Sequence, residues 1–221
     1  MKLKHFIYSL SILGIIFISY SFIVPAMENK LCDNSSAGVE LKTNMRKLWE
    51  DHITWTRNVV FNIIDDMPGK DEAVKRLLKN QDDIGNAIKP YYGEEAGKKL
   101  SALLHTHITQ AADLLTAAKK DDKTAFEEIN RKWKINADEI AVFLSKANPN
   151  WKFSEMKKMM QDHLTLTIDE AVARKKKNYS DDIKAYDKVH DEILEMSDML
   201  AMGIIEQFPE KFKTIASVGS K

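Results

Sequence analysis

The segment Asp51-His52-Ile53-Thr54 decides the fold, because closely similar segments recur along the chain at a nearly constant spacing. The repeats are His107-Ile108-Thr109 and Asp162-His163-Leu164-Thr165, whose histidines follow at intervals of 55 and 56 residues. A second type of segment, rich in acidic residues, follows each histidine: Asn80–Ile84, Asn136–Ile140 and Val189–Ile193. A constant period of this length is typical of tandem supersecondary units. The sequence therefore predicts three copies of one structural unit.

Each predicted unit contains two helices, because apolar residues recur at alternating steps of three and four and no strand pattern competes. The expected helices cover 41–65, 71–88 and 94–119, and three more begin near Thr124, Ser154 and Asn178. Pro90 with Gly93, then Pro149 and finally Pro209 mark expected helix ends. Short connections make consecutive helices antiparallel neighbours. We predict an all-α fold, a six-helix bundle built as three tandem antiparallel helical hairpins after an N-terminal hydrophobic segment.

Composition bounds the class of protein. The 221 residues are 44% hydrophobic and 30% charged, which is enough for one globular domain with a real core. Lys plus Arg equals Asp plus Glu at 33 each, so no nucleic-acid partner is expected. The single cysteine, Cys32, excludes an internal disulfide.

The N-terminus predicts export. Lys2 and Lys4 precede an apolar run over 6–24, and Ala26 fits a signal cleavage site. Residues 1–26 are therefore expected to be a signal peptide or a membrane anchor, with the membrane as a partner through 6–24 if the segment is uncleaved. The charge distribution places the remainder outside the cytoplasm, secreted or anchored to the cytoplasmic membrane. The remaining expected regions are a flexible tether over 27–40, the helical-bundle domain over 41–209 and a C-terminal tail over 210–221.

Polar residues occupy apolar-stripe positions at similar heights in the predicted hairpins. These residues are His52, His107, His163, Asn80 and Asn136. Buried polar groups require hydrogen-bond partners, so the pattern predicts a polar layer through the core. One interpretation is structural, with the layer setting the register between helices. The other is a site for a transition metal or haem, because imidazoles on facing helices ligate zinc, copper and iron.

Neighbouring residues extend the candidate site. His190 is a fourth candidate ligand, and the candidates for supporting positions, besides the two asparagines, are Asp51, Asp162, Asp83, Glu139 and Glu192. Met156, Met159 and Met160 precede His163, and soft thioethers suit Cu(I), although core packing explains a methionine stripe as well. The sequence does not require any cofactor.

Catalytic signatures are missing from the sequence. There is no glycine-rich phosphate loop and no Gly-x-Ser-x-Gly motif, so the sequence gives catalysis no support. The function expected from the sequence is therefore that of a non-catalytic binding or interaction protein with a polar core layer. The alternative is a metal- or haem-binding protein that uses histidines from several helices.

Three segments carry a family resemblance: Leu48–His52, Asn80–Gly93 and Tyr186–His190. They resemble an uncharacterised family of small secreted, all-helical bacterial proteins, and the likeness covers most of residues 40–209. Members of that family carry inconsistent functional labels, glycosyltransferase among them, and the resemblance assigns no functional residue. The helical pattern argues against the transferase label, because such enzymes need an α/β nucleotide-binding fold.

Overall fold

The computed structural model describes residues 34–213, and this part of the chain is all-helical, with no strand. It contains six α-helices and a terminal 3-10 helix: α2 (Ser36–Ile64), α3 (Lys70–Tyr92), α4 (Glu94–Lys119), α5 (Lys123–Ala147), α6 (Phe153–Lys175), α7 (Tyr179–Gln207) and η1 (Pro209–Lys211). The predicted all-α, six-helix bundle is confirmed. The expected signal peptide or anchor over 1–26, its cleavage site at Ala26 and the end of the tail lie outside the described residues.

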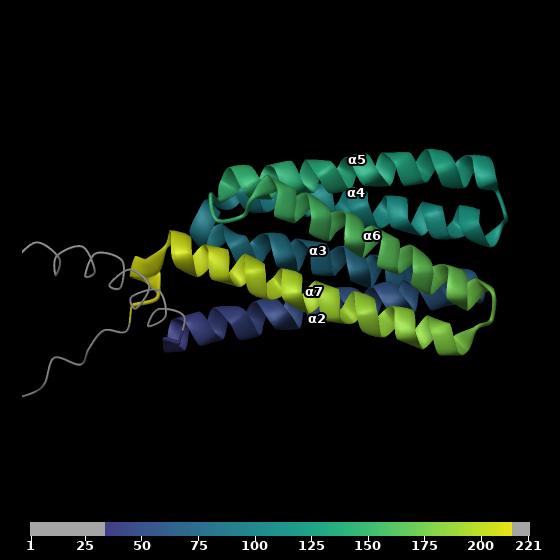
Figure 1. The fold of residues 1–221 in the computed structure, drawn as a ribbon, viewed down its shortest axis with the longest axis horizontal. Coiled ribbons are helices and arrows are strands. Elements are labelled where there is room, and N and C mark those ends of the chain that lie inside the picture. Colours follow the sequence, from purple (N-terminus) through teal and green to yellow (C-terminus); the bar gives the residue numbers. More distant parts are fainter. Residues whose placement is uncertain (1–33, 214–221) are drawn as a thin grey trace, which may run out of the picture.

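Consecutive helices pack as antiparallel neighbours, so α2–α3, α4–α5 and α6–α7 form the three expected hairpins (Figure 1). The turns within the hairpins lie at one end of the elongated bundle, and the two ends of the described chain lie at the other (Figure 1). Helix α2 also packs against α7, α4 and α6, which brings the first hairpin onto the other two. The helices that carry the three repeated histidines, α2, α4 and α6, are therefore mutual neighbours that run in the same direction.

The first helix begins earlier than the sequence predicts. It starts at Ser36, so the last five residues of the predicted tether over 27–40 are helical. The Ser35 side chain caps this start by accepting a hydrogen bond from the Gly38 backbone nitrogen at 3.0 Å. Gly38 and Leu41 are buried on the same helical face, so tertiary packing stabilises the extra turn.

Two predicted helix boundaries were also wrong. Pro90 does not end α3, which continues to Tyr92 and stops at Gly93, where φ is 86°. Glycine adopts a positive φ of this kind at little cost, so Gly93 can end the helix. Pro90 lies near the helix end and removes only one intrahelical hydrogen bond, so the helix continues past it. Helix α5 is capped by Asp122, whose side chain accepts from the Ala125 nitrogen at 3.0 Å, rather than by Thr124.

The domain extends beyond the predicted C-terminal boundary at residue 209. Phe212 is buried, and its ring stacks on Tyr91 with the ring centroids 5.9 Å apart. The Lys211 ammonium donates to the Pro90 carbonyl at 2.9 Å. The start of the predicted tail over 210–221 is thus part of the domain, because it covers the end of α3.

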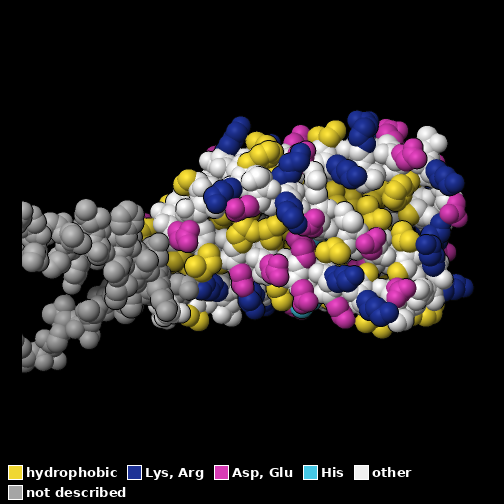
Figure 2. Space-filling view, viewed as in Figure 1, with side chains coloured by type: hydrophobic (Ala, Val, Ile, Leu, Met, Phe, Trp, Pro, Cys, Tyr) yellow, Lys and Arg dark blue, Asp and Glu magenta, His cyan; other side chains and the backbone are white. Residues whose placement is uncertain are grey.

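The surface of the described domain mixes both signs of charge. Figure 2 shows Lys and Arg interspersed with Asp and Glu over one face, with small groups of apolar side chains between them and very little histidine. No helix within residues 34–213 is long and apolar enough to cross a membrane. The distinctive polar chemistry of this domain lies inside the bundle rather than on this face.

Candidate ligand site at the histidine layer

The three repeated histidines meet in the core. His52 on α2, His107 on α4 and His163 on α6 are 3%, 3% and 4% exposed. The ring centroid of His163 lies 5.8 Å from that of His52 and 6.2 Å from that of His107. One imidazole from each hairpin therefore belongs to a single cluster, which we call the histidine layer.

A repeated contact holds each ring from its Nδ1 side. The partner always lies 29 residues further along, on the second helix of the same hairpin. His107 Nδ1 lies 3.0 Å from Asn136 Oδ1, and His163 Nδ1 lies 3.0 Å from a carboxylate oxygen of Glu192. His52 Nδ1 lies 3.2 Å from the Nε2 atom of Gln81. The histidine layer is thus a threefold duplicated motif with a different polar partner in each copy.

The hydrogen-bond network assigns the His107 tautomer. Asn136 donates its Nδ2 to the Leu103 carbonyl at 3.1 Å, so its Oδ1 faces the imidazole as an acceptor. His107 Nδ1 must therefore carry the proton, which leaves Nε2 with a free lone pair in the neutral ring. His163 donates Nδ1–H to the carboxylate oxygen of Glu192 in the same manner. This polarity is the one that metal-ligating histidines usually show.

Sequence reasoning missed Gln81 and named its neighbour Asn80. Both side chains are buried, but Asn80 Nδ2 donates to the Leu48 carbonyl at 2.9 Å, which matches the Asn136 contact with Leu103. The first copy thus uses two adjacent residues where the second copy uses Asn136 alone, and its contact with the ring has the opposite polarity, because Gln81 Nε2 donates to His52 Nδ1. The constant spacing of 29 residues from each histidine was the signal that could have identified Gln81.

Burial keeps two of the imidazoles neutral. Burial and, less strongly, the neighbouring His163 lower the pKa of His107 to about 3, against the opposing effect of the hydrogen bond with Asn136. The pKa of His52 is also lowered, first by burial and then by His163 and His107. A neutral imidazole is the form that binds metal ions, so these rings need no deprotonation at neutral pH.

An enclosed cavity of about 30 Å³ adjoins the histidine layer. All three histidines line it, together with aliphatic side chains and with three methionines and two tryptophans: Met45, Met160, Met196, Trp49 and Trp151. Both tryptophans are buried, and their indole Nε1 atoms have no hydrogen-bond partner among the described residues. The space accommodates one ion or a few water molecules.

The ring spacing is slightly wider than that of a closed metal site. Three imidazoles bound through nitrogen to one ion at about 2.0–2.1 Å would place their centroids roughly 5–5.5 Å apart. The two measured separations exceed this by about half an ångström or a little more. Accordingly, no group of three or more His, Cys, Asp or Glu within residues 34–213 already has the spacing of a metal site. Binding one ion through all three rings therefore requires the imidazoles to move closer together.

The fourth candidate histidine lies outside the layer. His190 on α7 points to Glu50 on α2, with Nε2 2.9 Å from both carboxylate oxygens. This pair ties the first and last helices together at the bundle surface and contributes nothing to the cavity lining.

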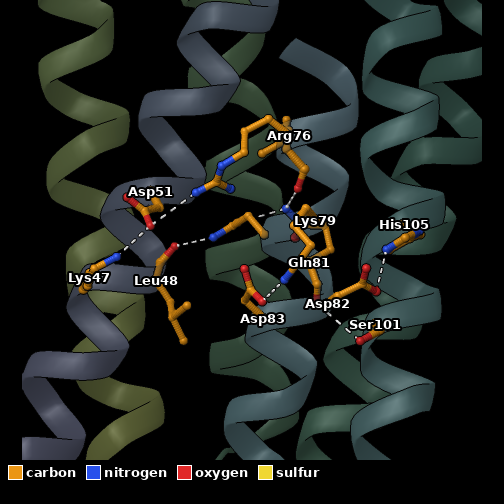
Figure 3. Close-up of polar contacts among 12 residues, drawn as sticks. Lys47, Leu48, Asp51, Arg76, Lys79, Gln81, Asp82, Asp83, Ser101 and His105 are labelled. Atoms are coloured by element: carbon orange, nitrogen blue, oxygen red, sulfur yellow. Dashed lines mark hydrogen bonds and ion pairs between the residues drawn. The ribbon is translucent and has the colours of Figure 1, made fainter. Parts of the chain in front are cut away.

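Most of the candidate acidic residues are also outside the histidine layer. Asp51 pairs with Lys47 at 3.0 Å and lies 3.7 Å from Arg76, on the outer side of α2 and α3 (Figure 3). Asp83 and Asp162 pair with lysines one turn earlier on their own helices, and Glu139 is exposed. Glu192 alone of the acidic candidates reaches a layer histidine. Asp82, next to Asp83, instead accepts a hydrogen bond from His105 Nε2, 3.0 Å away at the surface (Figure 3).

Sequence reasoning also missed a buried ionic cluster nearer the hairpin turns. Glu170 and Asp182 are almost fully buried and both accept from Arg57, at 2.7 and 3.1 Å. Arg174 also pairs with Asp182, and both guanidinium groups pack on the Phe61 ring, with distances to its centroid of 4.5 Å for Arg57 and 4.0 Å for Arg174. Burial raises the pKa of Glu170 to about 7, against the opposing charge of Arg57. The cluster joins α2, α6 and α7 below the histidine layer.

No protein-family model, curated protein or solved structure matches the chain. The resemblance to a family of secreted bacterial proteins therefore stays a prediction. The histidine layer and its cavity are interpreted from their own geometry and chemistry.

Proposed function

We propose that this protein is a non-catalytic binding protein that holds one transition-metal ion in its core, with His52, His107 and His163 as ligands. The observation that carries the proposal is the convergence of three buried imidazoles, one from each hairpin, beside an enclosed cavity. Three histidines with one further position are an established ligand set for zinc and for other first-row metals.

The partners behind the imidazoles support this proposal. Asn136 and Glu192 accept from Nδ1–H and so direct the unprotonated Nε2 lone pair of each ring away from the partner. Such contacts fix the tautomer and orientation of ligating histidines and raise their basicity. His52 differs, because Gln81 Nε2 is an amide donor that also bonds to the Leu77 carbonyl, so His52 Nδ1 accepts and the proton lies on Nε2. His52 must therefore change tautomer to bind an ion through Nε2.

The cavity size favours an ion over haem. A volume of about 30 Å³ is far below the space that a porphyrin occupies. The walls are side chains of core residues such as Ile84, Leu104 and Ile193, so a macrocycle would have to separate the helices. We therefore favour a bare ion within the class of metal-binding functions.

A second candidate is a scaffold in which the layer is purely structural. The observation in its favour is that each Nδ1 atom has a partner without any ligand, while the rest of the cavity wall is apolar. In that case the three copies of the motif specify helix register, and the protein acts through its surface.

Metal titration separates the two candidates. The purified protein is titrated with Co²⁺ and Zn²⁺, with the visible Co²⁺ spectrum and the thermal midpoint as readouts. We expect one ion per chain and a higher melting temperature, because a ligand that binds only the native state stabilises it. His163→Gln should abolish both effects, while His105→Gln, at the surface, should retain them. A protein whose spectrum and melting temperature ignore both ions would support the scaffold.

We further propose that the domain operates outside the cytoplasm. The proposal rests on Lys2 and Lys4 before the apolar run over 6–24, and on the small residue Ala26. Protease digestion of intact cells should degrade the domain if it is anchored outside, and culture medium should contain it if it is secreted. A domain found only in the cytosolic fraction would refute export.

A further inference from the structure

Three methionines line the same cavity as the histidine layer. Met45 comes from α2, Met160 from α6 and Met196 from α7, and all are at most 5% exposed. Among residues 34–213, the thioethers are the only sulfur groups in the cavity wall. A single enclosed space thus brings together imidazoles from three helices and thioethers from three helices.

The helix register places Met160 and Met196 about one turn from the level of the imidazoles, and Met45 about two turns from it. On α6, Met160 precedes His163 by three residues, an axial rise of about 4.5 Å. On α7, Met196 follows Glu192, the partner of His163, by four residues, or about 6 Å in the same direction because the helices are antiparallel. On α2, Met45 precedes His52 by seven residues, or about 10.5 Å, and it adjoins Arg46, which pairs with Asp198 of α7. Met160 and Met196 thus form a second layer, the methionine layer, above the histidine layer, and Met45 borders the cavity beyond it.

The side chains of the histidine layer lean toward the methionine layer. Side chains in an α-helix tilt toward the helix N-terminus. Helices α2, α4 and α6 run in the same direction (Figure 1), and each contributes cavity-lining residues on the N-terminal side of its histidine. These residues are Met45, Trp49, Leu100, Leu104 and Met160. The histidine layer is therefore the floor of the cavity, and its imidazoles tilt toward the space that the methionines border.

We propose that the ion is Cu(I), held between the histidine layer and the thioethers of Met160 and Met196. This inference rests on the proposed metal-binding function and specifies the metal. Soft thioethers favour Cu(I) over zinc, whereas neutral imidazoles accept both ions. A buried charge must be compensated, and among the described residues Glu192 is the one carboxylate bonded to the histidine layer. The single positive charge of Cu(I) therefore suits this apolar cavity better than the double charge of Zn²⁺.

Affinity measurements on the full-length protein test the choice of metal. Cu(I) affinity is measured anaerobically by competition with a chromophoric Cu(I) chelator, and Zn²⁺ affinity by competition with a zinc chelator. Met160→Leu/Met196→Leu conserves volume and should weaken Cu(I) binding roughly tenfold or more while leaving Zn²⁺ affinity nearly unchanged. Met67→Leu alters an exposed methionine outside the cavity and should change neither affinity.

Each outcome distinguishes this inference from the function on which it rests. If the double variant binds Cu(I) as tightly as the wild type does, the thioethers are not ligands, and the Cu(I) assignment is overturned while metal binding stands. If the wild type binds neither ion, both proposals fail. X-ray absorption of the Cu(I)-loaded wild type provides a test that needs no variant. Sulfur scatterers in the copper shell are expected, and a shell of nitrogen alone would refute the inference.

Discussion

Replacing His107 tests the prediction that a neutral imidazole is buried in the core. The perturbation is His107→Gln, whose amide can still donate to Asn136 Oδ1. In the native state the pKa of His107 is about 3, whereas an unfolded histidine titrates near 6.5. Between these two values the unfolded state binds more protons, so protonation stabilises the unfolded chain as the pH falls.

The expected magnitude follows from these two pKa values. At pH 5 the unfolded imidazole is almost fully protonated and the native one is neutral, which costs the folded state about 2 kcal/mol relative to pH 7.5. The glutamine variant lacks this cost. The free energy of unfolding of the wild type minus that of the variant should therefore decrease by about 2 kcal/mol over this pH range.

The assay is urea unfolding of both proteins at several pH values, monitored by circular dichroism. Taking the difference between the two proteins cancels titrations that are independent of His107, including that of Glu170. The pH profile of the difference should be flat above about pH 7 and fall below about pH 6.5. A difference that stays constant from pH 7.5 to 5, or that increases, would show that His107 is not held neutral and would refute the burial argument.

Two further predictions concern other buried positions. Glu170→Gln removes a carboxyl whose native pKa is raised to about 7, so wild-type stability from this group is lost as the pH rises from about 4.5 through 7. In the same urea assay, the free energy of unfolding of the wild type relative to this variant should increase by roughly 2 kcal/mol between pH 7.5 and pH 5. This pH dependence is opposite in sign to that expected for His107→Gln. Equal pH profiles for the two proteins would refute the raised pKa. Gly85→Ala should destabilise the protein by about 1–3 kcal/mol in thermal or urea unfolding, because a Cβ there would lie 2.0 Å from the Ser101 hydroxyl oxygen and 2.6 Å from the Gly97 carbonyl oxygen. Adding Ser101→Ala should recover only part of the loss, since the backbone contact remains; full recovery would contradict the close helix approach.

The limits of sequence reasoning are visible at the histidine layer. The repeat placed His52, His107 and His163 on apolar stripes, and the structure buries all three. The sequence did not distinguish Gln81 from Asn80 as the partner of His52, because both occur in the same segment. One residue along a helix rotates a side chain by about 100°, so only the packing of α3 on α2 determines which side chain faces the ring.

The acidic candidates show the same difficulty. Asp51, Asp83 and Asp162 were named because they adjoin the repeated segments, yet each forms ion pairs on the outer side of the bundle. Glu170 and Asp182, which are buried, were not named, because their cost of burial is offset by Arg57 from a distant part of the chain. Pairing between residues more than a hundred positions apart leaves no local pattern in the sequence.

The sequence by itself determined the number and order of the helices and the hairpin repeat, because helical periodicity and short connections are local properties. It also placed one histidine per hairpin on a buried face. Only the tertiary structure decided that the three imidazoles share one cluster, that Met45, Met160 and Met196 border the same cavity, and that His190 faces Glu50 instead. These outcomes depend on how the three hairpins rotate and slide against one another, and that arrangement is set by side-chain packing over the whole core.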